Sequence, residues 1–319
     1  MTSQKTALIL GVTGGIGGQL SDDLLAHGWA VTALVRDPAK AAKQCDPRVK
    51  LIAGDAMNAE DTRKAAEGVS VIAHCVNPPG YRDWDKLVMP MLDNTIAAAK
   101  AVGARILLPG TIYNYGPDAF PDLLASSPQH PISRKGAIRV EMEQRLEQAS
   151  RDGVPVLIVR AGDFFGGKSG GNNWMSQGLV KPGKPLTSVS SPYTAGVGHS
   201  WAYLPDLSET IALLLDRGTR SSFERYHFSG TYDATGHEMM DAIRTAAGKR
   251  DLKVRPFPWW LITLLSPFVT LFRETREMRY LWQYPLRLDN QELVTVLGQE
   301  PRTPLVDAVR KTLTDLGCV

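Results

Sequence analysis

The sequence predicts an α/β fold in which a doubly wound parallel sheet is joined to a smaller C-terminal lobe. Three observations lead to this prediction. Strand-like and helix-like segments alternate through the first half of the chain, as a parallel sheet with crossover helices requires. Glycines spaced three apart separate the first apolar segment from the first helix-like segment. Beyond Gly166 the alternation gives way to long loops and short elements.

The first predicted strand is the apolar run at residues 7–10, and Gly11, Gly14 and Gly17 follow it where a helix is expected to begin. Gly11 suits a tight turn, Gly14 lets the main chain approach a pyrophosphate, and Gly17 lets the helix pack closely on the strand. Backbone amides at a helix N-terminus bind phosphate well. The strand, loop and helix together therefore predict a Rossmann-type dinucleotide site.

The second predicted strand, residues 30–35, ends at Arg36 and Asp37. An acidic residue at this strand end typically binds the ribose hydroxyls of NAD, whereas a cation suits the 2′-phosphate of NADP. Arg36 comes first, nineteen residues after Gly17, so the sequence favours NADP(H). The alternative is a solvated Arg36 with Asp37 as the ribose ligand, and NAD(H) therefore stays open.

The remaining elements follow in order along the chain. Strands are expected at 49–54, 69–76, 104–109 and 154–159, with helices at 58–68, 84–102 and 137–150 between them. Gly, Ser, Asn and Pro crowd residues 166–198, which predicts loops of a binding site. A helix at 205–217, a strand at 225–229, a helix at 236–247 and a helical cap at 286–316 complete the chain.

These elements predict two regions. Residues 1–165 form an NADP-binding Rossmann core, and residues 166–319 form a mixed substrate-binding region. Part of the second region, about 199–230, is expected to return to the Rossmann sheet.

Composition narrows the classes of partner. The 319 residues carry a net charge of only +3 without a dense basic block, so nucleic acid is not an expected partner. Three widely spaced cysteines form no metal-ligand or disulfide pattern, and no other metal motif is present. The N-terminus leads directly into a strand, so we expect no signal peptide and a cytoplasmic protein.

Residues 257–272 are the most apolar segment of the chain. They are too few for a membrane-spanning helix, and Pro258 and Pro267 interrupt them. We expect helices that cover a pocket or an oligomer face, with contact to a membrane surface as the alternative.

Several of these features together resemble the short-chain dehydrogenase/reductase superfamily, and above all its extended and atypical branches, which include NAD-dependent epimerases and dehydratases. Gly54-Asp55 resembles the strand ending that the family places beside adenine, and residues 74–77 resemble the strand that runs under the cofactor. Residues 109–116 resemble the segment with the catalytic Ser/Thr, which puts that hydroxyl at Thr111. The residues 159–166, 201–206 and 297–305 are similar to later family segments.

The predicted cofactor-binding residues include those expected from the glycine loop, Arg36, and the residues that this resemblance implies. They are Gly11, Thr13, Gly14, Gly15, Ile16, Gly17, Arg36, Asp55, Ala56, Cys75, Val76, Asn77 and Arg139.

The chain departs from the family at the catalytic pair. The family uses Tyr-x-x-x-Lys, in which the lysine depresses the pKa of the tyrosine so that the phenol exchanges a proton with substrate. Aligning Glu143 with the glutamate that often follows this motif puts Lys135 in the tyrosine position and Arg139 in the lysine position. No tyrosine lies between Tyr115 and Tyr193.

Three functions stay open. The first is an atypical NADP(H)-dependent oxidoreductase that reduces a small carbonyl or conjugated acceptor. In it Lys135 donates the proton, Arg139 holds the ribose, Thr111 binds the substrate oxygen, and Tyr113 or Tyr115 could supply the missing phenol. The alternative for Lys135 and Arg139 is a pair of solvated cations beside Glu141 or Glu143.

The second function is a catalytically silent NADP(H)-binding sensor or regulatory protein, and the third is a nucleotide-sugar epimerase or dehydratase. The missing tyrosine counts against the third. Aromatic and amide side chains suited to a pocket count against the second; they are Tyr81, Trp84, Phe164, Phe165, Asn172, Asn173, Trp174, His199, Trp201 and Tyr203. A small-molecule substrate is expected in the enzymatic cases, and a homodimer stays open.

Overall fold

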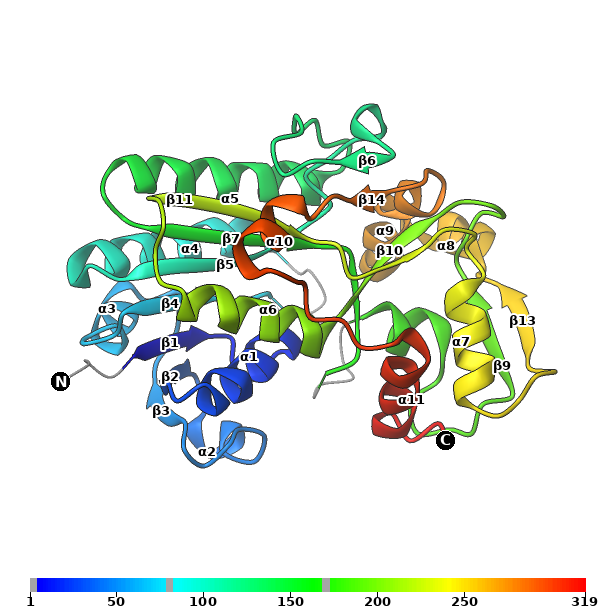
Figure 1. Ribbon diagram of the computed structural model, residues 1–319, viewed down its shortest axis with the longest axis horizontal. Coiled ribbons are helices and arrows are strands. Elements are labelled where there is room, and N and C mark those ends of the chain that lie inside the picture. The colour runs from blue at the N-terminus through cyan, green and yellow to red at the C-terminus, as the bar shows by residue number, and fades with distance from the viewer. Residues whose placement is uncertain (1–4, 79–82, 168–172) are drawn as a thin grey trace. The chain divides into compact units, whose positions relative to one another are not determined.

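The computed structural model describes residues 5–78, 83–167 and 173–319 (Figure 1). These residues form two compact units, each assembled from three separate stretches of chain. The first unit comprises Met1–Gly110, Ile138–Val159 and Ser208–Tyr226, and the second comprises Thr111–Ala137, Arg160–Leu207 and His227–Val319. Tyr81 and Asn172, two of the predicted pocket residues, lie outside the described residues.

A seven-stranded sheet has the order β11-β7-β5-β4-β1-β2-β3. Its strands are β1 (Thr6–Leu10), β2 (Ala30–Val35), β3 (Lys50–Ala53), β4 (Val71–His74), β5 (Arg105–Thr111), β7 (Val156–Ala161) and β11 (Phe223–Phe228). The pairs from β3 to β5 are parallel, and the strand order runs outward from β1 in both directions. This is the doubly wound α/β fold that the sequence predicts, and its strand order reverses between β1 and β4.

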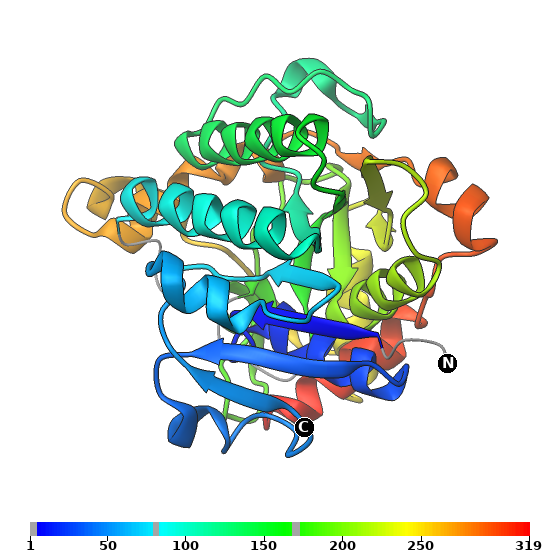
Figure 2. The same ribbon diagram turned by 90° about the vertical axis from the view of Figure 1, so that its left-hand side faces the viewer.

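Helices cover the sheet and connect its strands. They are α1 (Gly15–Ala26), α2 (Pro38–Ala41), α3 (Ala59–Ala65), α4 (Trp84–Val102), α5 (Arg134–Arg151) and α6 (Leu204–Asp216). Figure 2 shows α4 and α5 side by side over one face of the sheet. The predicted helix at 84–102 is confirmed at both ends, whereas α5 begins three residues before the predicted start at 137.

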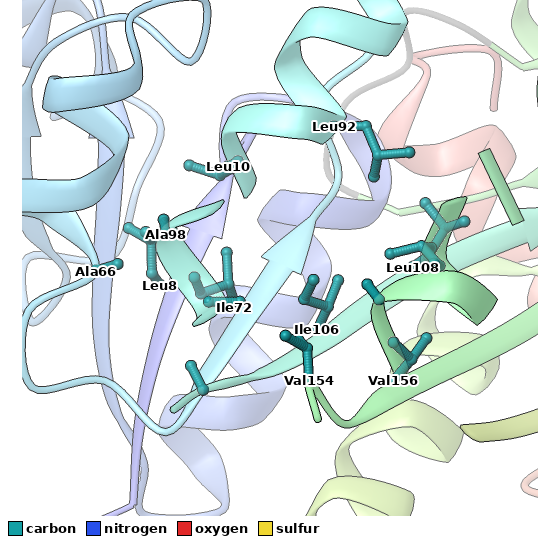
Figure 3. Packing of buried hydrophobic residues seen from close by; sticks show 14 of the residues in the cluster. Leu8, Leu10, Ala66, Ile72, Leu92, Ala98, Ile106, Leu108, Val154 and Val156 are labelled. Atoms are coloured by element: carbon teal, nitrogen blue, oxygen red, sulfur yellow. The ribbon is translucent and has the colours of Figure 1, made fainter. Parts of the chain in front are cut away.

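The core of the first unit lies between this sheet and the helices α3, α4 and α5. Leu8, Ile72, Ile106 and Val156 come from four neighbouring strands and are fully buried (Figure 3). Burying one such side chain contributes about 1.5–3 kcal/mol. The strands are therefore firmly held, and their carboxyl ends give the following loops a rigid base.

The second unit contains smaller sheets with the orders β12-β10-β8, β13-β9 and β14-β6. Its strands are β6 (Asp122–Leu123), β8 (Asp163–Phe165), β9 (Ser188–Ser191), β10 (His199–Tyr203), β12 (Thr231–Asp233), β13 (Lys253–Pro256) and β14 (Arg287–Leu288). Its helices are α7 (Glu238–Ala246), α8 (Trp259–Leu265), α9 (Thr270–Glu277), α10 (Gln291–Leu297) and α11 (Leu305–Asp315).

The stretch predicted as loops, 166–198, differs from the prediction in two places. It contains the π-helical turn η3 (Met175–Leu179) and the strand β9. Met175, Leu179 and Val189 are almost completely buried, so apolar burial fixes these short elements within a polar stretch.

In the first unit, His27 links the end of α1 to α6. Its Nδ1 lies 2.5 Å from Asp216 Oδ2 and its Nε2 lies 3.1 Å from Glu209 Oε2. Both ring nitrogens therefore face carboxylates. The hydrogen bond with Asp216, opposed by some desolvation and supported by Glu209, raises the pKa of His27 above its usual value.

This raised pKa predicts a pH-dependent contribution to stability. The contribution is fully present below the unfolded pKa of about 6.5 and is lost as the pH rises through the folded pKa. The free energy of unfolding should therefore differ more between wild type and His27→Gln at pH 6 than at pH 9, as measured by urea denaturation. An equal difference at both pH values would contradict the assignment.

Candidate functional site

The turn after β1 is built around glycines that no larger residue could replace without a shift of the backbone. Gly11 has a φ of +90°, and a Cβ on it would lie 2.6 Å from the carbonyl oxygen of Cys75. A Cβ on Gly17 would lie 2.3 Å from the carbonyl oxygen of Gly11. The first turn of α1 thus packs directly against the loop, as a phosphate-binding turn requires.

The N-terminus of α1 is open to an anion. Gly14 is the N-cap residue, no side chain among the described residues caps this end, and the first turn holds no acidic residue. Gly15 and Ile16 begin the helix, while Thr13 and Gly14 are exposed. The amides of this turn can therefore bind a phosphate group, which the helix dipole also favours.

Arg36 and Asp37, the two residues that follow β2, differ in their contacts. Asp37 caps α2, since its Oδ1 accepts a hydrogen bond of 3.0 Å from the Lys40 amide. Arg36 is exposed, and the structure gives it no hydrogen bond or ion pair within the described residues. The carboxylate thus has a structural partner, and the guanidinium is available to a ligand.

The loop after β3 is held by its own polar groups. Asp55 is half-buried, and its Oδ1 accepts a hydrogen bond of 3.0 Å from the Met57 amide. The amide of Asp55 donates to Asp61 Oδ2 at 3.0 Å. Asn94 of α4 donates to the carbonyl of the buried Ala56 at 2.9 Å. These bonds fix the segment for which the family resemblance implies contact with the adenine.

Three side chains of the first unit, those of Asn77, Trp84 and Arg139, are joined by contacts through Trp84 near the end of β4. Asn77 is exposed, and its Oδ1 accepts a hydrogen bond of 2.6 Å from the indole of Trp84. The guanidinium carbon of Arg139 lies 5.2 Å from the centroid of the Trp84 ring. Trp84 therefore holds the cation of α5 close to the loop that begins at Cys75 and Val76.

His74, the last residue of β4, is buried beneath this group. Its Nδ1 lies 2.8 Å from Thr95 Oγ1, and that hydroxyl donates to the carbonyl of Met91. The Nδ1 therefore carries the hydrogen. Burial, helped by the nearby Arg139 cation, lowers the pKa of His74 to about 3, so the ring is neutral. Burial likewise raises the pKa of the Cys75 thiol to about 12.

Thr111 and Tyr113 belong to the second unit. The Oγ1 of Thr111 accepts a hydrogen bond of 3.1 Å from the amide of Tyr113. The Tyr113 hydroxyl donates to Asp163 Oδ1 at 3.3 Å, and Asp163 Oδ2 lies 3.0 Å from His199 Nε2. His199 stacks on Trp282 with ring centroids 3.9 Å apart. Thr111 and Tyr113 are both half-buried, and the Tyr113 hydroxyl is engaged by the buried Asp163.

Tyr115 lies in a different environment from Tyr113. It is fully buried, and its hydroxyl lies 3.0 Å from His227 Nε2 and accepts a hydrogen bond from Arg160. Arg160, itself fully buried, also donates to the carbonyl of Ala125 at 3.0 Å. The Tyr115 hydroxyl is thus engaged inside the core of the second unit.

Lys135, in the first turn of α5, is buried rather than solvated, with only 4% of its surface exposed. Its Nζ lies 3.1 Å from Glu274 Oε2 and donates to the Glu274 carbonyl at 3.0 Å. Desolvation lowers the pKa of Lys135, and the attraction of Glu274 and Glu277 opposes this shift. A Cβ at the next residue, Gly136, would lie 2.1 Å from the Tyr113 carbonyl, so this turn packs against the Tyr113 segment.

Sequence reasoning missed Glu274. It is 139 residues from Lys135, and no local spacing connects the two positions. One signal was present: Glu274 is the first carboxylate after Asp251 in an apolar and basic stretch. A lone acid in such a stretch is a candidate partner for a buried cation.

Most of the eight predicted pocket residues that the structure describes are buried or engaged in local contacts, and Trp174 and Tyr203 pack, half-buried, against the core of the second unit. Phe165, His199 and Trp201 are almost fully buried and belong to the core of the second unit. Trp84 holds Arg139, and Asn173 accepts a hydrogen bond of 2.9 Å from the Ser176 amide. Much of the aromatic material therefore serves packing.

Comparison with known sequences adds an independent finding. The profile of the NAD(P)H-binding family matches residues 11–191. The bovine sterol-4-alpha-carboxylate 3-dehydrogenase, decarboxylating (Bos taurus), is 30% identical over 108 residues, which is 33% of this chain and 29% of that enzyme. The aligned part thus spans less than a third of this curated relative.

Solved structures resemble the chain over nearly its whole length. A UDP-glucose 4-epimerase from Bifidobacterium longum, solved with NAD+ and UDP, superposes with a TM-score of 0.73 at 16% identity over 97% of both chains. A putative epimerase from Burkholderia cenocepacia gives 0.75 at 18% identity, over 99% of this chain and 98% of the other. At these identities the similarity establishes the fold.

Proposed function

The chain belongs to the NAD(P)H-binding family, and on this premise we propose that it is an extended short-chain dehydrogenase/reductase, related to the NAD-dependent epimerases/dehydratases. We propose further that it is an NADPH-dependent reductase of a small carbonyl or conjugated acceptor. The observation that carries the proposal is the open N-terminus of α1 behind Gly11 and Gly17. A nicotinamide dinucleotide whose diphosphate is bound at this turn would supply the hydride from its nicotinamide ring.

In this proposal, different residues bind different parts of the dinucleotide. The amides after Gly14 hold the diphosphate, and the segment at Asp55 and Ala56 lies beside the adenine. Asn77 and Arg139 serve the nicotinamide half, with Trp84 fixing the guanidinium. Arg139 acts as a hydrogen-bond donor only, because its pKa stays above about 12.

Arg36 is the proposed ligand of the 2′-phosphate. Arg36→Asp should weaken NADPH binding about tenfold or more and improve NADH binding, because it replaces an attractive charge with a repulsive one. Calorimetric titration with both nucleotides measures the change. Lys50→Asp is the matched control, since it makes the same charge change at the first residue of β3. Unchanged NADPH affinity in Arg36→Asp would remove the assignment.

Lys135 is the proposed proton donor. Reduction of a carbonyl leaves an alkoxide oxygen that needs a proton, and a lysine with a lowered pKa donates one more readily near neutral pH. Glu274 holds the ammonium in one orientation and opposes the loss of its charge. Thr111 and Tyr113 are the proposed hydrogen-bond partners of the acceptor oxygen, whereas the buried Tyr115 has a structural role in this proposal.

One observation favours the silent NADP(H)-binding protein as a second candidate: the Lys135 ammonium is already engaged by Glu274. Turnover separates the two. The purified protein is incubated with NADPH and a panel of aldehydes, ketones, quinones and enones, and absorbance at the nicotinamide band is followed. Consumption with any acceptor supports the reductase, whereas tight NADPH binding without consumption across the panel supports the silent protein.

A further inference from the structure

The helices α8 and α9 and the turn between them carry large apolar side chains that the fold leaves exposed. Trp260 is 72% exposed, Leu264 63%, Phe268 84% and Leu271 48%. Together with Val269, which is 37% exposed, they form the longest run of such residues along the described chain, and we call these five residues the apolar face. Soluble surfaces rarely gather large apolar side chains in this way without a binding partner.

The opposite sides of the two helices are firmly attached to the second unit. Ile262 is buried, and Trp259 donates a hydrogen bond of 3.0 Å to the carbonyl of Pro192. In α9, Glu274 pairs with Lys135 of α5, while Arg276 joins α9 to the end of α8 by donating to Ser266 Oγ at 3.1 Å. The apolar face is therefore the outer side of an anchored pair of helices.

The exposed charged side chains of the segment 253–276, which carries this face, are all positive, while the exposed Asp251 precedes it and the half-buried Glu277 follows it. Between residues 253 and 276 the exposed charged side chains are Lys253, Arg255, Arg273 and Arg276. Glu274 is the single carboxylate in this range, and it is turned inward, with 13% of its side chain exposed. Exposed apolar and cationic side chains thus occur together, and a negatively charged, partly apolar surface would complement them.

We propose that this face docks α8 and α9 onto the surface of an anionic lipid bilayer. Amphipathic helices that lie in the interface combine Trp, Phe and Leu with Lys and Arg in this way. Each cation near an anionic membrane adds to the attraction. A second copy of the chain is a less suitable partner for this face. In a two-fold symmetric dimer the cations of one copy would face the same cations of the other copy, and they would repel each other. Among the described helices none is long and apolar enough to cross a membrane, so the docking is peripheral. It does not depend on the proposed reductase activity.

Co-sedimentation of the full chain with vesicles tests the proposal. Wild type should sediment with phosphatidylcholine vesicles that contain phosphatidylserine, and much less with phosphatidylcholine alone. Leu264→Ser combined with Phe268→Ser should lower the bound fraction about tenfold at limiting lipid. Arg273→Glu should weaken binding in the mixed vesicles only.

The matched control is Leu124→Ser combined with Ile132→Ser, which removes two side chains of similar exposure elsewhere in the second unit and should leave binding unchanged. Circular dichroism verifies that each variant folds. Absence of wild-type binding to the mixed vesicles would overturn the proposal. So would a lipid-free dimer, seen by light scattering, that the double variant at 264 and 268 dissociates.

Discussion

Replacing Lys135 by Met is expected to lower NADPH-dependent turnover by about 10²- to 10⁴-fold, the usual contribution of a positioned proton donor. Dinucleotide binding should persist, because the predicted phosphate contacts belong to the α1 turn. Steady-state rates with an acceptor that wild type reduces, together with calorimetry for NADPH, measure the two properties separately. Full activity of Lys135→Met would transfer the acid role to Tyr113, and Tyr113→Phe would then be the inactive variant.

Stability must be separated from catalysis in this experiment. Lys135→Met leaves the inward-facing Glu274 carboxylate without its ammonium partner, which is destabilising. The double variant Lys135→Met/Glu274→Gln removes both charges, so it should regain stability and stay inactive. Glu274→Gln alone should retain activity, but loss of the carboxylate lowers the pKa of Lys135 further, so the alkaline limb of the rate profile should move to lower pH.

Gly17→Ala is expected to weaken binding of both nicotinamide dinucleotides on the order of ten- to a hundredfold. The new Cβ would lie 2.3 Å from the Gly11 carbonyl oxygen and 3.2 Å from Cys75 Cβ, so the phosphate-binding turn must move. Calorimetry on the folded variant measures the affinity.

Gly28→Ala is the control for this substitution. Gly28 follows α1, has a φ of +80°, and a Cβ there would meet nothing within 4 Å. The control thus introduces backbone strain without entering the turn, and it should bind like wild type. Equal affinity of Gly17→Ala and wild type would show that the dinucleotide does not lie on this turn.

The sheet core was predictable because its signals are local. Buried parallel strands are continuous apolar runs, and Gly17 marks a close approach to Gly11, which is near in sequence. The fold class and α4 are therefore confirmed. The start of α5 was predicted three residues late because Arg134 and Lys135 are polar; Lys135 is buried only through a partner far along the chain.

Contacts between side chains that lie far apart in the sequence could not be predicted from it. Glu274 meets Lys135, and His199 meets Asp163, only after distant segments fold together. The apolar segment 257–272 is helical as predicted, but which side of each helix is exposed depends on Trp259 and Ile262 packing into the second unit. Periodicity identifies an apolar face without showing what covers it.

Calorimetric titration of NADPH and NADH into the folded wild-type protein tests the proposed function most directly, because each of its residue assignments depends on a dinucleotide at the N-terminus of α1. We expect saturable one-site binding that is tighter for NADPH than for NADH and is weakened for both nucleotides by Gly17→Ala. Absence of binding by either nucleotide to the folded protein would contradict it.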